Sequence, residues 1–219
     1  MASTEDHRIA ELEAEAARLT ARLRELDHRI KNDLQLIASV FVLQTRRTPE
    51  GPERELVKSS LARVSAVAAV HRRLDVLGDA ARLEVSGLVR DLVEEAVAGA
   101  RREDVRAELT LEPVTLPARQ AAPLAMIIGE LVRNALAHGL ADRPGRVEVS
   151  LGAKAGEVEL VVRDDGVGLG DAPRGFGLTL TGLLAQQLRG ALEVTDAKPG
   201  VRATVRFPAT PAEDPAGSP

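Results

Sequence analysis

The sequence predicts a protein of two parts: a long helical hairpin that dimerises into a four-helix bundle, followed by an α/β sandwich. Apolar residues near the N-terminus recur at alternating spacings of three and four, and turn-forming residues at 48–52 interrupt this pattern. Further along, short strand patterns alternate with helical ones. We expect the hairpin at residues 1–80, the sandwich at residues 81–208 and a disordered tail at residues 209–219.

The composition is that of a folded protein with an aliphatic core. With 219 residues, 44% of them hydrophobic, the chain can form one ordinary domain and a smaller one. The absence of Cys excludes disulfides and thiolate sites, and a net charge of −4 gives no nucleic-acid-binding signature. Because the N-terminus is polar and no apolar run approaches about 18–20 residues, we expect a cytoplasmic protein without membrane insertion.

The first predicted helix carries a coiled-coil seam. It starts at a capping box formed by Ser3 and Asp6 and continues to about Arg47. Seven apolar residues form its seam: Ile9, Leu12, Ala16, Leu19, Leu23, Leu26 and Ile30. Their spacing of three and four residues is typical of a left-handed coiled coil.

His28 lies on the outer surface of this helix. When the first seam residue is assigned to heptad position a, His28 falls at position f and points into water. We expect the seam to continue through Leu34, Ile37 and Phe41, which introduces a stutter between Ile30 and Leu34 within one turn of His28. On this stretch alone, a solvated histidine on a coiled-coil surface is the favoured explanation of the pattern.

A second helix completes the hairpin. Glu53 and Glu55 occupy its first turn, where the helix dipole favours acidic residues. One face carries Val57, Leu61, Val64, Ala68 and His71. This apolar face is too wide for one neighbouring helix to cover, so we expect two hairpins to pair as a homodimer, with His71 packed inside the bundle.

The second part reads as helices beside a mixed or mostly antiparallel sheet. Strand patterns occur at 83–85 and 105–111, and two hairpins are predicted, 147–151 with 158–162 and 191–194 with 201–207. Helical patterns occur at 86–100, 121–138 and 178–188. We expect Ser86 to cap the first of these helices. Together these elements indicate an α/β sandwich.

Three polar clusters interrupt this apolar pattern. Glu130 and Asn134 are four residues apart on one face of an apolar helix, where their oxygens suit a hydrated Mg²⁺; a solvent-exposed polar pair is the alternative explanation. Asp164, at the end of an apolar strand, begins the pattern Asp-x-Gly-x-Gly, and such a carboxylate can accept a hydrogen bond from an exocyclic amine.

The glycines of these clusters allow close approach to a ligand. Gly166 and Gly168 permit the backbone to approach a flat base. Gly175 and Gly177 open a helix, whose free N–H groups and dipole favour phosphate. The clusters are more specific in this order and on these elements than any of them is alone.

The clusters resemble known sequence motifs. Asn134, Asp164-x-Gly166-x-Gly168 and Gly175-x-Gly177 resemble the N, G1 and G2 boxes of the Bergerat-fold ATPases, which include histidine kinases, gyrase-type enzymes and Hsp90. Residues 28–35, His-Arg-Ile-Lys-Asn-Asp-Leu-Gln, resemble the H box of the HisKA_2 class of two-component histidine kinases, and Arg63-Val64 and residues 70–74 resemble the second helix of its dimerisation hairpin. The resemblance covers roughly residues 20–208.

This resemblance implies an ATP-dependent protein-histidine kinase. His28 would accept the phosphoryl group of Mg-ATP and pass it to an aspartate of a response regulator receiver domain. Asn134 would hold Mg²⁺, with Glu130 assisting as a metal and catalytic residue, and Asp164 would bind the adenine amine. Residues 81–208 would then be the ATP-binding catalytic domain.

The same resemblance implies the remaining nucleotide contacts. The four glycines Gly166, Gly168, Gly175 and Gly177 would line the nucleotide. Residues 169–174 would form a short ATP lid. Many relatives carry a basic residue where this chain has Ala137, and Arg174 is the expected substitute for its phosphate contact.

Several assignments stay open from the sequence. Asp27 precedes His28 and Arg29 follows it, so the base that acts on the histidine is not identified. No sensor domain is recognisable, so the signal would come through the N-terminal coiled coil, from a separate sensor or upstream protein, or from a segment outside this sequence. A histidine phosphotransferase with an inactive ATPase domain, which relays phosphate without using ATP, is one alternative. Such domains typically lose the residues that correspond to Asn134 and Asp164. A Bergerat-fold protein-serine kinase or anti-sigma-type regulator is another, although such proteins generally lack the long hairpin.

Overall fold

The computed structural model describes residues 2–73, 82–169 and 175–209. A helical hairpin comes first and a mixed α/β domain follows, in agreement with the predicted fold class. The side chains of residues 2–5, including the predicted cap at Ser3, lie outside this description, as does the predicted tail from residue 210 onward.

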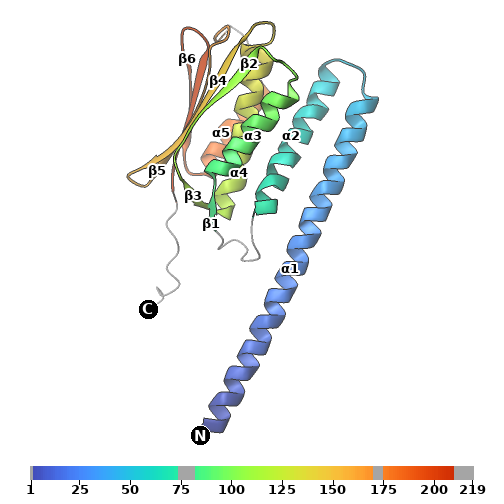
Figure 1. Cartoon of the computed structure of the whole chain (residues 1–219), viewed down its shortest axis with the longest axis vertical. Coiled ribbons are helices and arrows are strands. Elements are labelled where there is room, and N and C mark those ends of the chain that lie inside the picture. Colours follow the sequence, from blue (N-terminus) through green and yellow to red (C-terminus); the bar gives the residue numbers. More distant parts are fainter. Residues whose placement is uncertain (1, 74–81, 170–174, 210–219) are drawn as a thin grey trace.

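Helices α1 (Ala2–Arg47) and α2 (Pro52–Arg73) form the hairpin. The amide of Thr48 donates to the carbonyl of Gln44 at 2.9 Å, and α2 then begins at Pro52, whose missing N–H costs nothing at a helix start. Figure 1 shows the N-terminal half of α1 extending well beyond α2. None of the described helices is long and apolar enough to cross a membrane.

The apolar row of α1 does not contain the predicted stutter. Leu34 and Phe41 are half-buried on the side of α1 that packs against α2, whereas Ile37 stays 44% exposed and Val40 48% exposed. The exposed row therefore continues from Ile30 to Ile37 and Val40 in the original heptad register. The prediction was wrong because two faces of one helix, one turned toward α2 and one turned outward, were read as a single seam.

A five-stranded sheet forms one layer of the second domain. Its order is β2-β4-β5-β7-β6, with β2 parallel to β4 and every other pair antiparallel. The strands are β2 (Val105–Leu111), β4 (Gly145–Lys154), β5 (Glu157–Asp164), β6 (Ala191–Asp196) and β7 (Val201–Pro208). The short strands β1 (Arg82–Glu84) and β3 (Thr115–Pro117) pair separately. Both predicted hairpins are present.

Three helices cover one face of this sheet (Figure 1). They are α3 (Ser86–Gly99), α4 (Ala118–Asn134) and α5 (Phe176–Gln187), and α4 continues into a π-helical turn, Ala135–Gly139. The core between sheet and helices is aliphatic apart from Phe207. On its other side α4 packs against α2, so α2 lies between α1 and the sandwich.

Ser86 does not cap α3 as predicted. Its hydroxyl donates to the carbonyl of Glu112 at 2.6 Å and makes no cap bond to the helix. Glu84 takes that role, because its carboxylate accepts from the amides of Ser86 at 2.7 Å and Gly87 at 3.4 Å. Partial burial raises the pKa of Glu84, but its hydrogen bonds together outweigh that effect. The pKa of Glu84 therefore lies below its usual value.

Candidate functional site

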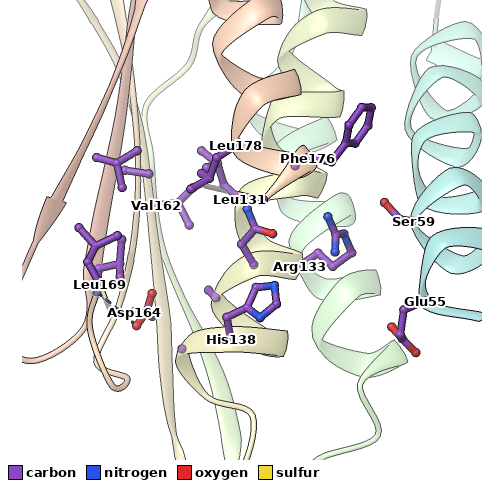
Figure 2. Close-up of a pocket in the computed structure, with 18 of the residues that line it drawn as sticks. Glu55, Ser59, Leu131, Arg133, His138, Val162, Asp164, Leu169, Phe176 and Leu178 are labelled. Atoms are coloured by element: carbon purple, nitrogen blue, oxygen red, sulfur yellow. Dashed lines mark hydrogen bonds between the residues drawn. The ribbon is translucent and has the colours of Figure 1, made fainter. Parts of the chain in front are cut away.

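A pocket of about 540 Å³ lies between the sheet, α4, the start of α5 and helix α2. Asp164 lines it from the end of β5, and Asn134 and His138 line it from the end of α4 and its π-helical turn. Figure 2 shows Asp164 on the sheet side, with Ser59 and Glu55 of α2 on the opposite side. The three polar clusters predicted from sequence therefore converge on one pocket.

Asp164 is a buried carboxylate at one end of this pocket. It is 5% exposed, and its Oδ1 accepts from the amides of Gly166 at 2.9 Å and Val201 at 3.3 Å. Burial raises the pKa of Asp164, and the two backbone donors oppose that rise. Within the described chain Oδ2 has no hydrogen-bond donor, so it is available to a ligand amine.

Glycines surround this carboxylate because no side chain would fit. A Cβ at Gly139 would lie 2.6 Å from Asp164 Oδ1, and one at Gly166 would lie 2.7 Å from it. Gly168 has a φ of +85°, which disfavours other residues, and a Cβ there would lie 2.9 Å from Asp196. The sequence motif includes Gly166 and Gly168. It does not include Gly139, which lies next to Asp164 only once the chain has folded.

Glu130 and Asn134 meet the start of α5 at the other end of the pocket. A Cβ at Gly177 would lie 2.7 Å from Glu130 Oε2 and 3.3 Å from Asn134 Oδ1, so glycine permits this close contact. Gly175 precedes α5 in an extended conformation, with nothing near the position of its absent Cβ. The first amides of α5 are thus placed beside the pocket, where a helix N-terminus favours an anion.

Glu130 is fully buried between two guanidinium groups. Its Oε1 accepts from Arg63 Nε of α2 at 2.8 Å, and its Oε2 accepts from Arg133 Nη2 of α4. Arg63 also lies over the ring of Phe176, 4.9 Å from the centroid. Arg63 therefore joins the hairpin to both helices of the pocket.

The arrangement suits Mg²⁺ at Asn134 better than at Glu130. Both oxygens of Glu130 already contact a guanidinium group, so the side-chain oxygen of Asn134 is the more available hard ligand. In the described ranges no group of three His, Cys, Asp or Glu residues could hold a metal ion. A hydrated Mg²⁺ still fits, because this ion takes few protein ligands and draws the rest from phosphate and water.

The structure adds Arg63, Arg133 and His138 to the residues expected from sequence. His138 lies four residues after Asn134, and Arg133 three residues after Glu130, so helical spacing was the available signal for both. Arg63 had no local signal, because its partners lie in another domain. The expected phosphate ligand Arg174 and residues 170–173 of the predicted lid lie outside the described residues, whereas Leu169 lines the pocket.

His28 is exposed on α1 and does not line the pocket. Its Nδ1 lies 3.2 Å from Asn32 Nδ2, one turn along the helix. Asp27, one candidate for the base, pairs with Lys31 at 2.6 Å, and Arg29 pairs with Glu25 at 2.5 Å. The imidazole thus stands at the surface with only Asn32 bonded to it among the described residues.

Two protein families match the chain, one over each part. Residues 25–99 match HisKA_2, described as histidine kinase. Residues 119–211 match HATPase_c, described as histidine kinase-, DNA gyrase B- and HSP90-like ATPase. The first match contains His28, the second half of α1 and all of α2, and the second contains the whole of the described pocket except its α2 wall.

Curated relatives and solved structures agree with these matches. The sensor histidine kinase PdtaS of Mycobacterium tuberculosis is 32% identical over 202 residues, which cover 86% of this chain and 39% of PdtaS. A blue-light-activated histidine kinase of Rhizobium johnstonii is 31% identical over 94% of this chain and 57% of its own length. The chain thus spans only part of these relatives.

The fold matches that of a solved kinase domain. The histidine kinase domain of a blue-light activated histidine kinase from Erythrobacter litoralis aligns with a TM-score of 0.65 at 22% identity. This match covers 89% of this chain and 94% of that domain. At this level of identity the likeness shows the fold alone.

Proposed function

Because this chain belongs to the HisKA_2 class of histidine kinases, we propose that it transfers the terminal phosphoryl group of Mg-ATP to His28. A response regulator receiver domain would then take the group onto an aspartate. The observation that carries the proposal is the pocket, in which a buried carboxylate, an asparagine and a helix N-terminus converge on a chain that also presents an exposed histidine.

Asp164 would fix the adenine end of ATP. Asp164 lines a pocket edged by glycines and by the aliphatic side chains of Val162 and Val201. A flat base fits between such walls, and its exocyclic amine would donate to the carboxylate. The ionised form of Asp164 is the one that accepts this bond.

Asn134, Arg133 and the first turn of α5 would hold the triphosphate end. The guanidinium and the helix N-terminus neutralise phosphate charge, and Gly177 lets α5 approach Asn134. Mg²⁺ bound at Asn134 would supply charge neutralisation at the reacting phosphate. The protein contributes mainly positioning and electrostatic stabilisation.

His28 would be the nucleophile. One ring nitrogen forms the N–P bond while the bond between the γ-phosphorus and the bridging oxygen breaks, and ADP leaves with that electron pair. The other ring nitrogen then loses its proton to restore a neutral phosphoimidazole. In the present pairing the Asn32 amide nitrogen donates to Nδ1, which puts the ring proton on Nε2; a flipped Asn32 amide would instead accept from Nδ1–H and leave Nε2 free to attack.

Phosphoryl transfer would require the catalytic domain to leave α2. In the present arrangement α2 packs between α1, which carries His28, and α4, which carries Asn134 (Figure 1). Rotation of the catalytic domain against the hairpin would bring the pocket to a histidine of the same or a partner chain. The arrangement described here would then be a resting state.

We expect the functional unit to be a homodimer. The outward row of α1 exposes Ile9, Leu12, Leu19, Leu23, Leu26, Ile30, Ile37 and Val40. Each is between 42% and 60% exposed in the single chain, and together with Ala16 they form an apolar stripe at heptad spacing, in which Asp33 occupies one seam position. A second copy presents the same stripe, so pairing covers both.

Chemical stability of the bound phosphate tests the proposed activity. The protein is incubated with Mg²⁺ and ATP labelled at the γ-phosphate, and samples are then treated with acid or alkali. A phosphohistidine should lose label in acid and keep it in alkali. Label that survives acid would instead indicate a phosphoserine and support the protein-serine kinase reading, and a chain that never labels would contradict the kinase proposal.

A further inference from the structure

Ser59 on α2 presents a buried hydroxyl to the nucleotide pocket. The residue is 5% exposed, and its Oγ has no hydrogen-bond partner among the described residues. Its neighbour Ser60 shows the usual behaviour of a helical serine, because the Ser60 hydroxyl donates to the carbonyl of Leu56 at 3.0 Å. Ser59 lines the pocket, and Figure 2 shows its oxygen turned from α2 toward the side where Arg133 lies.

Arg133 faces the same space with a second unsatisfied donor. Its Nη2 binds Glu130, but its Nε is buried and unpartnered in the described chain. A buried donor without an acceptor is unfavourable, and native proteins rarely keep one without a partner, water or ligand. Here two such donors, from α2 and from α4, line one pocket.

The charge of this region suits an anion. Arg63 and Arg133 both contact Glu130, so these three groups carry an excess of one positive charge, and the carboxylate of Glu55 on the same wall is paired with Lys58 at 2.6 Å. The first turn of α5, with its free amides, starts beside them at Phe176. A phosphate oxygen is the acceptor that would satisfy both donors and this charge.

The position of Ser59 selects the part of the nucleotide it would meet. Asp164, which would hold the base, is on the sheet side of the pocket, and Ser59 is on the opposite wall (Figure 2). A nucleotide that extends from Asp164 past Asn134 therefore brings its last phosphate nearest to α2. We propose that Ser59 Oγ and Arg133 Nε bind the terminal phosphate of ATP, so that helix α2 of the hairpin completes the nucleotide site.

This inference rests on the proposed function, since it requires ATP in the pocket. Through α2, it adds a discrimination between ATP and ADP to the one that Arg133 of the catalytic domain would make. ADP would keep the contacts to Asp164 and Asn134 but would not reach Ser59. The α2 wall would therefore favour ATP over ADP while the catalytic domain stays docked on the hairpin.

The test compares nucleotide affinities by isothermal titration calorimetry on the full chain. The ligands are a β,γ-imido analogue of ATP, which is not consumed, and ADP, both with Mg²⁺. Ser59→Ala should weaken the ATP analogue about tenfold and ADP less than about twofold. Ser60→Ala removes a hydroxyl from the same helix outside the pocket, and both affinities should stay at wild-type values.

A second variant keeps the proposal testable through the other donor. Arg133→Lys keeps the positive charge toward Glu130 but removes Nε, and it should weaken the ATP analogue about fivefold with little change for ADP. Ser59→Ala should melt at or slightly above the wild-type temperature without ligand, because it removes an unsatisfied buried hydroxyl.

The possible results separate this inference from the proposed function. If wild-type protein binds the ATP analogue and Ser59→Ala keeps the wild-type ratio of affinities for the analogue and ADP, the hydroxyl is satisfied by water and the inference is overturned alone. If wild-type protein binds neither nucleotide, the proposed function fails together with it.

Discussion

Asp164 is the residue on which the proposed nucleotide binding would depend most directly. Asparagine at this position can keep Oδ1 as the acceptor for Gly166 and Val201, but it places an amide where the carboxylate Oδ2 would meet the adenine amine. We expect Asp164→Asn to weaken ATP binding by about tenfold or more, with fold and oligomeric state unchanged. Calorimetry checks this, and wild-type affinity in the variant would remove Asp164 from the site.

The raised pKa of Asp164 predicts the sign of a pH effect. Between its ordinary value and its raised value, the folded chain binds more protons than the unfolded chain. Binding of this proton stabilises the folded chain at low pH. This stabilisation is lost as the pH rises through the pKa that Asp164 has in the folded chain. At neutral pH the unliganded Asp164→Asn variant should therefore be as stable as wild type or slightly more so, and this advantage should shrink on acidification. Urea unfolding at several pH values measures it, and a variant advantage that grows in acid would contradict it.

Asn134 separates metal-dependent turnover from nucleotide binding. Its side-chain oxygen is the available hard ligand of the pocket, because Glu130 is held by two guanidinium groups. We expect Asn134→Ala to reduce Mg²⁺-dependent phosphorylation at least about a hundredfold while it retains measurable nucleotide binding. Full phosphorylation by this variant would displace the metal assignment.

At the scale of elements, Arg63 holds helix α2 against the catalytic domain. Its bond to the buried Glu130 and its contact with Phe176 both cross from hairpin to sandwich. Since Arg133 still pairs with Glu130, we expect Arg63→Ala to destabilise the docked chain by about 1–3 kcal/mol rather than to unfold it. Hydrogen exchange should show faster opening where α2 meets α4. Arg72→Ala, on the exposed side of the same helix, is the matched control. Equal effects of the two variants would show that Arg63 does not hold α2 against the catalytic domain.

Most individual elements could be predicted from the sequence, because they depend on local patterns. Both sheet hairpins and the turn at 48–52 follow from the positions of glycine and proline. The contacts between elements could not be predicted in the same way. Leu34 and Phe41 were assigned to the outward seam because periodicity alone does not say which neighbour a face meets, and the roles of Ser59 and Arg63 arise only when α2 packs on α4.

In the candidate site too, residues in local motifs could be predicted, whereas contacts between distant residues could not. Asp164, Gly166, Gly168, Asn134 and Gly177 could be found because their spacing is local and their chemistry is specific. Gly139 is adjacent to Asp164 in space but not in sequence, and only the close contact between them shows why glycine stands there. The same holds for Glu84, which caps α3 from outside the helix in place of the expected Ser86.

At the scale of the whole molecule, the outward stripe of α1 predicts a dimer. Leu23 lies at a seam position and is 50% exposed in the single chain, whereas Ala21 lies two residues away at position f. Wild-type protein should have a dimer mass by light scattering at micromolar concentration. Leu23→Asp should shift it toward monomer, and Ala21→Asp should not. A monomeric wild type would contradict the prediction and leave the stripe for another partner.

The overall arrangement separates the proposed acceptor histidine from the proposed nucleotide pocket. His28 lies on α1, the pocket closes against α2, and only a domain movement brings them together. The proposed function therefore depends on His28, an exposed side chain that does not line the pocket.

Mass spectrometry of the protein after incubation with Mg-ATP, at alkaline pH to preserve phosphoramidates, tests whether His28 is the residue that accepts the phosphoryl group. We expect one phosphoryl group on His28 and no labelling of His28→Gln. Nucleotide binding and dimer mass should be unchanged in that variant. His71→Gln, which changes the half-buried histidine of α2, should still become labelled. Phosphate found on His71 or on a serine, or a His28→Gln variant that labels like wild type, would contradict the account.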